Sequence, residues 1–383
     1  MHYKEKSISL DNPLSFWQHF KNEERVLFYN PLTRELILGA KRLKTFSGQE
    51  SYQDYPYIFS SMTFFDSVKD EKWAGLGNET IAFQYYYTEK NGLQTLYYCG
   101  KPVKIENLAV QKCRHAYRYQ ADDHESWEQL FGSLNNAIAS KAVNKVVISK
   151  EVRIECDTVI QVESVLQNLM ENNQNSNSFI FAYHKEGKTF LGATPEILVQ
   201  KDQDNILSYA LAGTISRTVN DDEAQKARLL HDAKNRYEHQ IVIDTIAAAM
   251  KEFAGEVQVA ETSVLTLRNL HHLQTPIYTT DKNRTLPEWA ARLHPTPALG
   301  GNPVKEAVEL IRKYEKHERG LYAAPLGIMD ANGNGIFVAG IRSALIQGNV
   351  AFAYAGCGLV DKSEYRAEYM EADNKLRTII ESL

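Results

Sequence analysis

Acidic side chains recur at helical spacing in two segments of this chain, a pattern suited to binding a metal ion. Near the end of the chain, Glu368, Glu371 and Lys375 are three and four residues apart, so a helix would carry them along one face. Asn235 and Glu238 stand three apart and would also share a helix face. One carboxylate from each helix could bind Mg²⁺, which is typically coordinated by one or two protein carboxylates plus an anionic substrate. Glu371 and Lys375 are also a common surface ion pair at spacing four, which by spacing alone is the simpler interpretation, so spacing does not establish a metal site.

A single arginine interrupts an apolar segment near residue 340. Arg342 lies within FVAGIRSALI, which the pattern predicts to be a strand, and by alternation it shares a face with Gly340, Ala344 and Ile346. A guanidinium on an inward face needs an anion, and its planar fork suits a carboxylate. The alternatives are an arginine on a solvated edge strand or a structural ion pair.

Two further side chains could transfer protons. Lys145 opens the apolar segment KVVIS, and a lysine there acts as a general base only if desolvation or a neighbouring cation lowers its pKa. Glu196 follows the segment 192–195, which ends in proline, and a carboxyl group held in a cleft acts as a general acid if its pKa is raised. A lysine at the exposed start of a strand and a glutamate on a solvated loop are the simpler interpretations.

Glycines end several apolar segments. Gly213-Thr214 and the pair Gly356 and Gly358 follow such runs, where a missing side chain could let backbone N–H groups approach an anion. Ordinary turns explain these glycines equally well. The pair His271-His272 has no helical metal partner four residues on, so a structural role is the simpler interpretation. The sequence contains no GxGxxG, P-loop or HExxH motif.

The elements that must position these residues mix strands and helices without a regular βαβ repeat. The expected strands cover 25–29, 57–65, 80–88, 145–149, 179–184, 188–193 and 206–212, with an antiparallel meander over 321–356. A first helix is expected from about 121, with Asp122 and Asp123 ahead of its apolar residues. Further helices are expected over 221–253, with Asn220 as the N-cap, over 303–317 and over 363–381. This arrangement favours an α+β fold, a single large body of antiparallel sheets flanked by helices. No linker divides the chain, so residues 1–114 are expected to form a strand-rich part of the same body as residues 115–383.

The bulk composition is that of an ordinary soluble protein. The chain of 383 residues is 43% hydrophobic and 24% charged, and its net charge of −5 gives no general attraction to nucleic acid or anionic membranes. The charged N-terminal segment predicts no signal peptide, and the longest nearly apolar stretch, residues 350–360, is too short to cross a bilayer. The cysteines are scattered and fit reduced thiols, so we expect a cytoplasmic protein.

Taken in order, the segments around these residues resemble the chorismate-utilising enzymes. The segments are NKVVISK (144–150), GATPEIL (192–198), LAGTISR (211–217), NRYEHQIV (235–242), LHHLQTPI (270–277), LHPTPALGG (293–301), GIRSALI (340–346), AGCGLV (355–360) and EYMEADNKL (368–376). Their common order makes the resemblance specific, and it covers roughly residues 115–383. That superfamily contains isochorismate synthases, salicylate synthases, anthranilate synthase large subunits and the first component of aminodeoxychorismate synthase.

This resemblance implies a fold, a cofactor and roles for particular residues. Its members fold as one α+β body of antiparallel sheets flanked by helices, and they require Mg²⁺. Glu238 and Glu371 would bind the ion directly, and Glu368 would support it through water. Asn235, where several relatives carry an acid, would stand in the same outer layer. The residues that would bind the substrate's two carboxylates and line its ring pocket are Arg342, Lys375, Gly213, Thr214, Gly356, Gly358, His272 and Ala298.

Two positions divide the branches of this superfamily. Lys145 resembles the lysine with which isochorismate and salicylate synthases activate water, whereas relatives that use ammonia generally have glutamine there. Ala212 stands where aminodeoxychorismate synthases place a nucleophilic lysine. The implied activity is that of an isochorismate synthase. Lys145 would remove a proton from the water that attacks C2 of chorismate, and Glu196 would donate a proton to the departing C4 hydroxyl.

The resemblance also implies partners and leaves alternatives. A salicylate synthase, which also eliminates pyruvate, is the alternative enzyme, and a non-catalytic chorismate-binding protein is the alternative of another class. The expected ligands are chorismate, isochorismate and Mg²⁺, with no nucleic acid, membrane or glutamine amidotransferase subunit. We expect a monomer. Menaquinone, siderophore and salicylate biosynthesis all stay open as the destination of the product.

Overall fold

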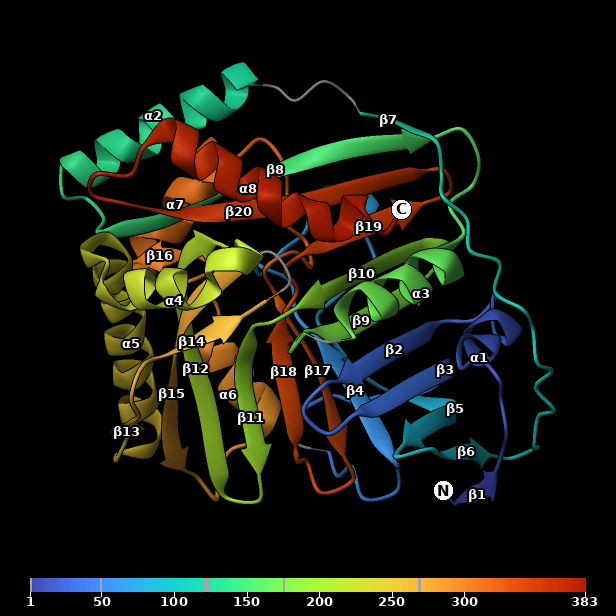
Figure 1. Ribbon diagram of the computed structural model, residues 1–383. Helices are drawn as coiled ribbons and strands as arrows, with labels where there is room; N and C mark the ends of the chain where they lie inside the picture. The colour runs from blue at the N-terminus through green and yellow to red at the C-terminus, as the bar shows by residue number, and fades with distance from the viewer. Residues whose placement is uncertain (1, 49, 120–123, 175, 268–269) are drawn as a thin grey trace.

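The chain forms one continuous network of antiparallel strands with helices on its outside (Figure 1). The computed structural model describes residues 2–48, 50–119, 124–174, 176–267 and 270–383. Within these ranges, pairing links 20 strands into one sheet, and the pairings are antiparallel. The predicted α+β class with antiparallel sheets is therefore confirmed.

The network divides at β5 (Glu79–Lys90) into two arms. One edge of β5 pairs with β3 (Glu35–Thr45). The other edge pairs first with β4 (Tyr57–Ser61) and then with β6 (Leu93–Cys99), which carries β1 (Tyr3–Ser7). The strands reached through β3 are called the β8 arm below, and those reached through β4 the β12 arm.

The β8 arm ends in a long, buried strand. In order of pairing from β3, the arm contains β2 (Arg25–Asn30), β9 (Phe179–Lys185), β10 (Lys188–Thr194), β19 (Ser343–Gln347), β20 (Val350–Val360) and β8 (Lys145–Cys156), whose outer edge carries β16 (Gly301–Asn302) and β7 (Tyr117–Tyr119). The helices that pack on this arm are α1 (Leu14–His19), α2 (His124–Ala139), α3 (Val162–Asn173), α7 (Val304–Tyr314) and α8 (Tyr365–Ile380). Because α8 packs on β20, it is fixed over the strand that carries Gly356 and Gly358.

The β12 arm carries the second set of helices. In order of pairing from β4, it contains β17 (Pro325–Asp330), β18 (Gly335–Ala339), β11 (Ile197–Asp202), β12 (Asn205–Ser216) and β15 (Leu270–Thr280), whose outer edge carries β13 (Gln258–Val259) and β14 (Ser263–Thr266). α4 (Asp222–His231), α5 (Ala233–Ala254) and α6 (Leu286–Leu293) pack on this arm. Ile246, Met250 and Trp289 are buried in the core between these helices and the strands, which fixes α5 against β12.

The chain crosses between the two arms at two short segments. β10 ends in the β8 arm and β11 begins in the β12 arm, so Pro195 and Glu196 form one crossing. Residues 340–342 form the other, between β18 and β19. The antiparallel meander predicted over 321–356 is therefore interrupted between β18 and β19, and this part of the prediction is wrong. β17 pairs with β18 and β19 pairs with β20, but β18 and β19 belong to different arms.

Arg342 consequently lies outside any strand, and its predicted alternation with Gly340, Ala344 and Ile346 is wrong. It has a φ of 51°, in the left-handed region that turns the chain sharply. Two residues earlier, a Cβ at Gly340 would lie 2.5 Å from the carbonyl oxygen of Leu321, so glycine is required for this close approach. The turn leaves the Arg342 side chain buried.

The helix predicted over 221–253 is divided in two. α4 ends at His231, and Asp232, with a ψ of 120°, separates it from α5. The side chain of Asp232 accepts a hydrogen bond from the backbone N–H of Asn235 at 2.8 Å, as is typical of aspartate at an N-cap. Asn220, the predicted N-cap, lies instead in a short 3₁₀ helix, η2 (Val219–Asp221). Asp122 and Asp123, predicted to stand at the start of the helix that begins near 121, lie outside the described residues.

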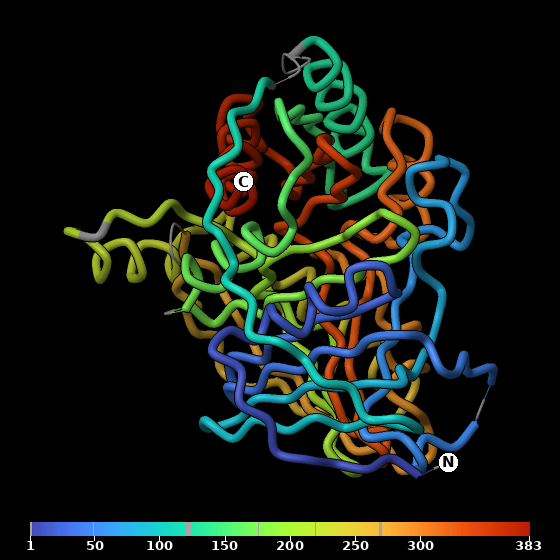
Figure 2. Tube along the Cα trace, turned by 90° about the vertical axis from the view of Figure 1, so that its right-hand side faces the viewer, coloured from blue at the N-terminus to red at the C-terminus, as the bar shows by residue number. Residues whose placement is uncertain are grey.

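The N-terminal strands contribute to both arms, because β2 pairs with β9 and β4 pairs with β17. Residues 100–116 form neither helix nor strand and run along the outside of the molecule toward β7 (Figure 2). Among the helices of the described ranges, none is both long and apolar enough to cross a membrane.

Candidate active site

A cavity of about 70 Å³ lies where the two arms separate. Strands β8 and β20 line one side of it and β12 and β15 another. The rest of the wall comes from α5, α8, the two crossings and the loops that carry Ala298-Leu299 and Tyr322-Ala323. The sequence-predicted residues that line it are Lys145, Glu196, Gly213, Thr214, Glu238, His272, Ala298, Arg342, Gly356, Gly358, Glu371 and Lys375. Of the predicted residues, only Glu368 and Asn235 do not line this cavity.

Lys145 is buried at the start of β8 rather than exposed, with only 1% of its surface accessible. Its Nζ lies 2.8 Å from Oε1 of Glu238 on α5, so the two arms meet through this ion pair. A Cβ at Gly358 would lie 2.6 Å from that Glu238 oxygen and 2.8 Å from Cε of Lys145. Glycine at 358 thus leaves the space in which the lysine and the carboxylate meet.

Glu196 is also buried, although a solvated loop was the simpler interpretation of its position. Its backbone is fixed on both sides: its N–H donates to Oγ1 of Thr194, and its carbonyl accepts from the N–H of Ala339. Burial raises the pKa of the Glu196 carboxyl to about 7, against the opposing effect of Lys145 and the cations beyond it. A large share of these carboxyl groups is therefore protonated near neutral pH and able to donate a proton.

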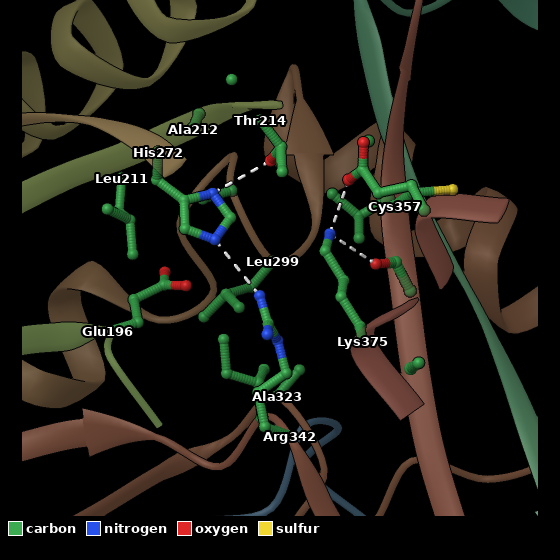
Figure 3. A pocket seen from close by; sticks show the side chains of 18 of the residues that line it. Glu196, Leu211, Ala212, Thr214, His272, Leu299, Ala323, Arg342, Cys357 and Lys375 are labelled. Carbon is green, nitrogen blue, oxygen red and sulfur yellow. Dashed lines mark hydrogen bonds and ion pairs between the residues drawn. The ribbon is translucent and has the colours of Figure 1, made fainter. Parts of the chain in front are cut away.

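Arg342, His272 and Thr214 form a hydrogen-bonded chain along the cavity wall (Figure 3). Nη2 of Arg342 lies 3.2 Å from Nε2 of His272, and Nδ1 of His272 lies 3.0 Å from Oγ1 of Thr214. Arginine can only donate, so Nε2 of His272 accepts and Nδ1 carries the single proton. Burial and the neighbouring Arg342 lower the pKa of His272 well below its usual value, which agrees with a neutral ring. The proton of the Thr214 hydroxyl is then left to donate into the cavity.

Burial also lowers the pKa of Arg342 to about 10, an effect that the neighbouring Glu371 opposes. The guanidinium is therefore still charged at neutral pH. A buried cation on the wall of a cavity favours an anionic ligand over a neutral one.

A second set of charges comes from α8. Lys375 Nζ donates to Oε1 of Glu371 at 2.7 Å and to the carbonyl of Gly356 at 2.9 Å, so the helix is tied to β20 at this point. Glu368, one helical turn before Glu371, is buried behind the cavity and accepts a hydrogen bond from Lys234 Nζ at 2.7 Å. Burial, and then the nearby Glu371, raise the pKa of Glu368. The rise therefore comes mainly from the burial of the Glu368 carboxyl and in part from its proximity to Glu371.

Asn235, on α5, is hydrogen-bonded to the backbone of β12. Its Oδ1 accepts from the N–H of Thr214 at 2.9 Å, and its Nδ2 donates to Asp232 at 2.8 Å. Gly213 has a φ of 78° at a bulge in β12, and a Cβ there would lie 3.1 Å from the carbonyl oxygen of Asn235. The N–H of Thr214 is therefore engaged within the protein, and the Thr214 hydroxyl is the group left for a ligand.

The carboxylates of Glu238 and Glu371 are the groups that could hold a metal ion. Both line the cavity, and each is presently oriented by a lysine, Lys145 or Lys375. Across the described ranges, no set of three or more His, Cys, Asp or Glu side chains is grouped as a complete metal site. Two oxygen donors with cavity space beside them fit Mg²⁺, which retains waters and takes further oxygens from an anionic ligand.

Several residues that line the same cavity were not predicted to act in catalysis or to bind the substrate or the metal. They are Val147, Pro195, Leu211, Ala212, Leu299, Tyr322, Ala323, Ile341, Ala355 and Cys357. Tyr322 is the most polar of them, and burial raises its pKa. Its ring stacks on Tyr354 with centroids 5.3 Å apart, and a Cβ at Gly356 would lie 2.9 Å from its hydroxyl. The chain has 21 tyrosines, and no spacing distinguishes this one.

Comparisons with known proteins agree in family and in fold. The sequence model of the family described as "Chorismate binding enzyme" matches residues 101–383. The isochorismate synthase MenF of Bacillus subtilis is 40% identical over 265 residues, covering 68% of this chain and 56% of that protein. The isochorismate synthase EntC of Escherichia coli K12 is 32% identical over 267 residues, covering 69% of this chain and 68% of that protein. The matched part thus spans little more than half of the Bacillus subtilis relative.

A solved structure extends the similarity of fold over the whole chain. The menaquinone-specific isochorismate synthase of Escherichia coli superimposes with a TM-score of 0.84 at 22% sequence identity, covering 99% of this chain and 94% of that one. At this identity the match concerns the fold, including the strands before residue 101 that the family model does not reach.

Proposed function

The chain belongs to the family of chorismate binding enzymes, and we propose that it is an isochorismate synthase. The observation that supports this most is that one cavity holds a buried lysine, Lys145, and a buried acid, Glu196, whose pKa of about 7 lets it donate a proton. Exchange of a ring hydroxyl for water requires one group that takes a proton and another that gives one. The relatives named above as isochorismate synthases support the same assignment.

The cations of the cavity suit a substrate with two carboxylates. Arg342 and Lys375 lie on different elements, the crossing at 340–342 and α8, so they can bind carboxylates at two points of one ring. We assign the Thr214 hydroxyl as a further donor, because the neutral ring of His272 leaves its proton free. Ala298 and His272 line the space for the ring. These contacts would fix which ring carbons face Lys145 and Glu196.

The chemistry that we propose exchanges one water for another. Lys145 is the base that accepts a proton from the water whose oxygen bonds to C2. Both ring double bonds shift by one position, from C1=C2 to C1=C6 and from C5=C6 to C4=C5, as the bond between C4 and its hydroxyl breaks and Glu196 donates a proton to the departing oxygen. One water is consumed and one is released, so the reaction is balanced and reversible. Each proton transfer contributes about 10²–10⁴-fold to the rate.

We propose Mg²⁺ as the cofactor, held by Glu238 and Glu371 and supported through water by Glu368. Bound there, Mg²⁺ supplies charge neutralisation for a substrate carboxylate. The protein's own part is to keep the two carboxylates directed at the cavity, which the bonds from Lys145 and Lys375 now do.

Product identification tests this function. The protein is incubated with chorismate and Mg²⁺, with and without ammonia, and the products are separated by chromatography. Isochorismate in both reactions, and none in excess EDTA, is the expected result. Salicylate with pyruvate would assign a salicylate synthase, and an aminated product a relative that uses ammonia. Tight chorismate binding without turnover would assign a binding protein and overturn the enzymatic proposal.

A further inference from the structure

Between the parts that pair with β16 and β7, the outer edge of β8 is completed by side chains rather than by a strand. β16 pairs only with Lys145 and Val146. Beyond it, the carbonyl of Val147 accepts from Arg319 Nη2 at 2.7 Å, and the N–H of Ser149 donates to Glu315 Oε1 at 2.7 Å. These side chains satisfy two buried backbone groups that a neighbouring strand would otherwise satisfy.

Arg319 is the centre of this arrangement and is fully buried. Its Nε and Nη2 donate to the two oxygens of Glu315 at 2.9 and 2.6 Å. Its Nη1 donates to the carbonyl of Leu299 at 2.8 Å. The planar guanidinium thus joins the end of α7, the loop before β16 and the middle of β8 in one fixed geometry.

Besides the end of α7, the segments that Arg319 holds form part of the cavity wall. Val147 and Leu299 line the cavity, and Tyr322, whose N–H donates to the carbonyl of Arg319 at 2.7 Å, lines it as well. Val147 is two residues from Lys145, so the side chains of both point to the same face of β8. The substrate-binding cations Arg342 and Lys375 make no contact with Arg319 within the described residues.

We propose that Arg319, oriented by Glu315, is a positioning residue that sets where Lys145 stands relative to the ring pocket. The proposal rests on the proposed function of Lys145 as the base. Arg319 touches no reacting group itself. A lysine in its place could keep the charge but could not reach the Glu315 carboxylate and both backbone carbonyls from one nitrogen. In that variant Lys145 would shift, while Arg342 and Lys375, which bind the carboxylates of the substrate, would stay in place.

This arrangement predicts a specific kinetic signature. Arg319→Lys should lower kcat by about 10–100-fold, because a displacement near 1 Å from a remote substitution has that effect. The KM for chorismate should change little, because Arg342 and Lys375 are untouched. Hydrogen exchange should become faster in the peptide that spans residues 145–151.

Arg25 supplies a matched control. It is also a buried arginine that donates to backbone carbonyls, those of Phe20 and Glu23, but it does not line the cavity. Arg25→Lys should lower the melting temperature yet keep kcat. Equal losses of stability in the two variants with unchanged kcat in both would overturn the proposal.

Two further results keep the test decisive. Should Arg319→Lys fail to fold, Glu315→Gln keeps an acceptor for Ser149 while removing the charge that orients Arg319, and it should lower kcat at an unchanged KM. A wild-type level of kcat in that variant would overturn the proposal. Absence of isochorismate from the wild-type protein would instead count against the proposed function, whereas the exchange of residues 145–151 reports on Arg319 alone.

Discussion

A cluster of charged side chains borders the cavity, and another, called the N-terminal cluster below, lies away from it. In the N-terminal cluster, Arg42 donates to Glu24 and also contacts Glu79, while Lys185 Nζ lies 2.5 Å from Glu79. Tyr183 adds a hydrogen bond to Glu24 at 2.7 Å. Each carboxylate there is matched by a cation, and none of these side chains lines the cavity between the arms.

The cavity cluster is less completely paired. Lys145 and Glu238 form an ion pair, but within the described part of the chain no cation lies within bonding distance of the Glu196 carboxylate. Burial therefore acts on Glu196 without full compensation and raises its pKa. In the N-terminal cluster, the hydrogen bonds that Arg42 donates to Glu24 and Glu79 outweigh burial and raise the pKa of Arg42. A cluster of charged side chains therefore does not by itself indicate a functional site. A charged group that is buried, incompletely paired and next to a cavity does indicate one.

The largest expected effect on kcat comes from replacing Lys145 in the cavity cluster, with Lys185 in the N-terminal cluster as the control. Lys145→Ala should lower kcat by about 10²–10⁴-fold, because it removes the base. Lys185→Ala, which breaks the equivalent pair with Glu79, should leave kcat unchanged. Steady-state kinetics on both variants, with circular dichroism to confirm folding, provide the measurement. Similar kcat values for the two variants would erase the distinction between the clusters.

Glu196→Gln should also lower kcat by about 10²–10⁴-fold, because the amide has no acidic proton to donate. The same change should stabilise the protein at alkaline pH. The carboxyl pKa rises from 4.5 to about 7 on folding, so its contribution to stability is fully present below 4.5 and is lost as the pH rises through 7.

Glutamine removes this dependence on pH. Above pH 7.5 the free energy of unfolding of the variant should therefore be about 3 kcal/mol higher than that of the wild type, and at pH 5 the difference should be much smaller. Urea unfolding at the two pH values measures this. An equal difference at both would mean that the Glu196 carboxyl is not held in a desolvated place.

Glu368→Gln should have an intermediate effect, on metal use rather than on chemistry. A residue that supports a metal site from outside typically changes metal affinity by about 10–100-fold. The Mg²⁺ concentration for half-maximal activity should rise accordingly. Glu24→Gln in the N-terminal cluster is the control and should leave that concentration unchanged. A Glu368 variant with wild-type Mg²⁺ dependence would remove this residue from the metal site.

Arg42→Met should have the smallest effect on activity. It leaves Glu24 and Glu79 short of their partner, so the free energy of unfolding should fall by about 1–3 kcal/mol while kcat is retained. Urea unfolding and kinetics on the same preparation measure both quantities. A loss of kcat at unchanged stability would connect the N-terminal cluster to catalysis.

The sequence was informative about elements and about residue types. The apolar runs located β9 and β10 closely and the starts of β8 and β12, although β8 continues to Cys156 and β11 was not predicted. The helical spacing of Glu368, Glu371 and Lys375 matches α8. Such patterns are local, because side chains a few residues apart decide whether one face of a helix or strand is buried.

The burial of the individual site residues could not be predicted from local patterns. Lys145 and Glu196 each had a solvated interpretation, since their burial depends on strands that pair across long stretches of chain, such as β10 with β19. The turn at Arg342 depends on the packing of Gly340 against Leu321, a contact that alternation within FVAGIRSALI does not encode. The order of motifs along the chain, rather than any one spacing, identified the site.

Oxygen-18 labelling tests most directly whether Lys145 and Glu196 exchange a hydroxyl with solvent. The protein, Mg²⁺ and chorismate are incubated in H₂¹⁸O, and the position of the label is determined by mass spectrometry. The predicted product is isochorismate that carries one ¹⁸O, in the hydroxyl on C2, because that oxygen comes from water. Isochorismate with an unlabelled C2 hydroxyl would contradict the mechanism, since the C4 hydroxyl would then have migrated without any attack by water.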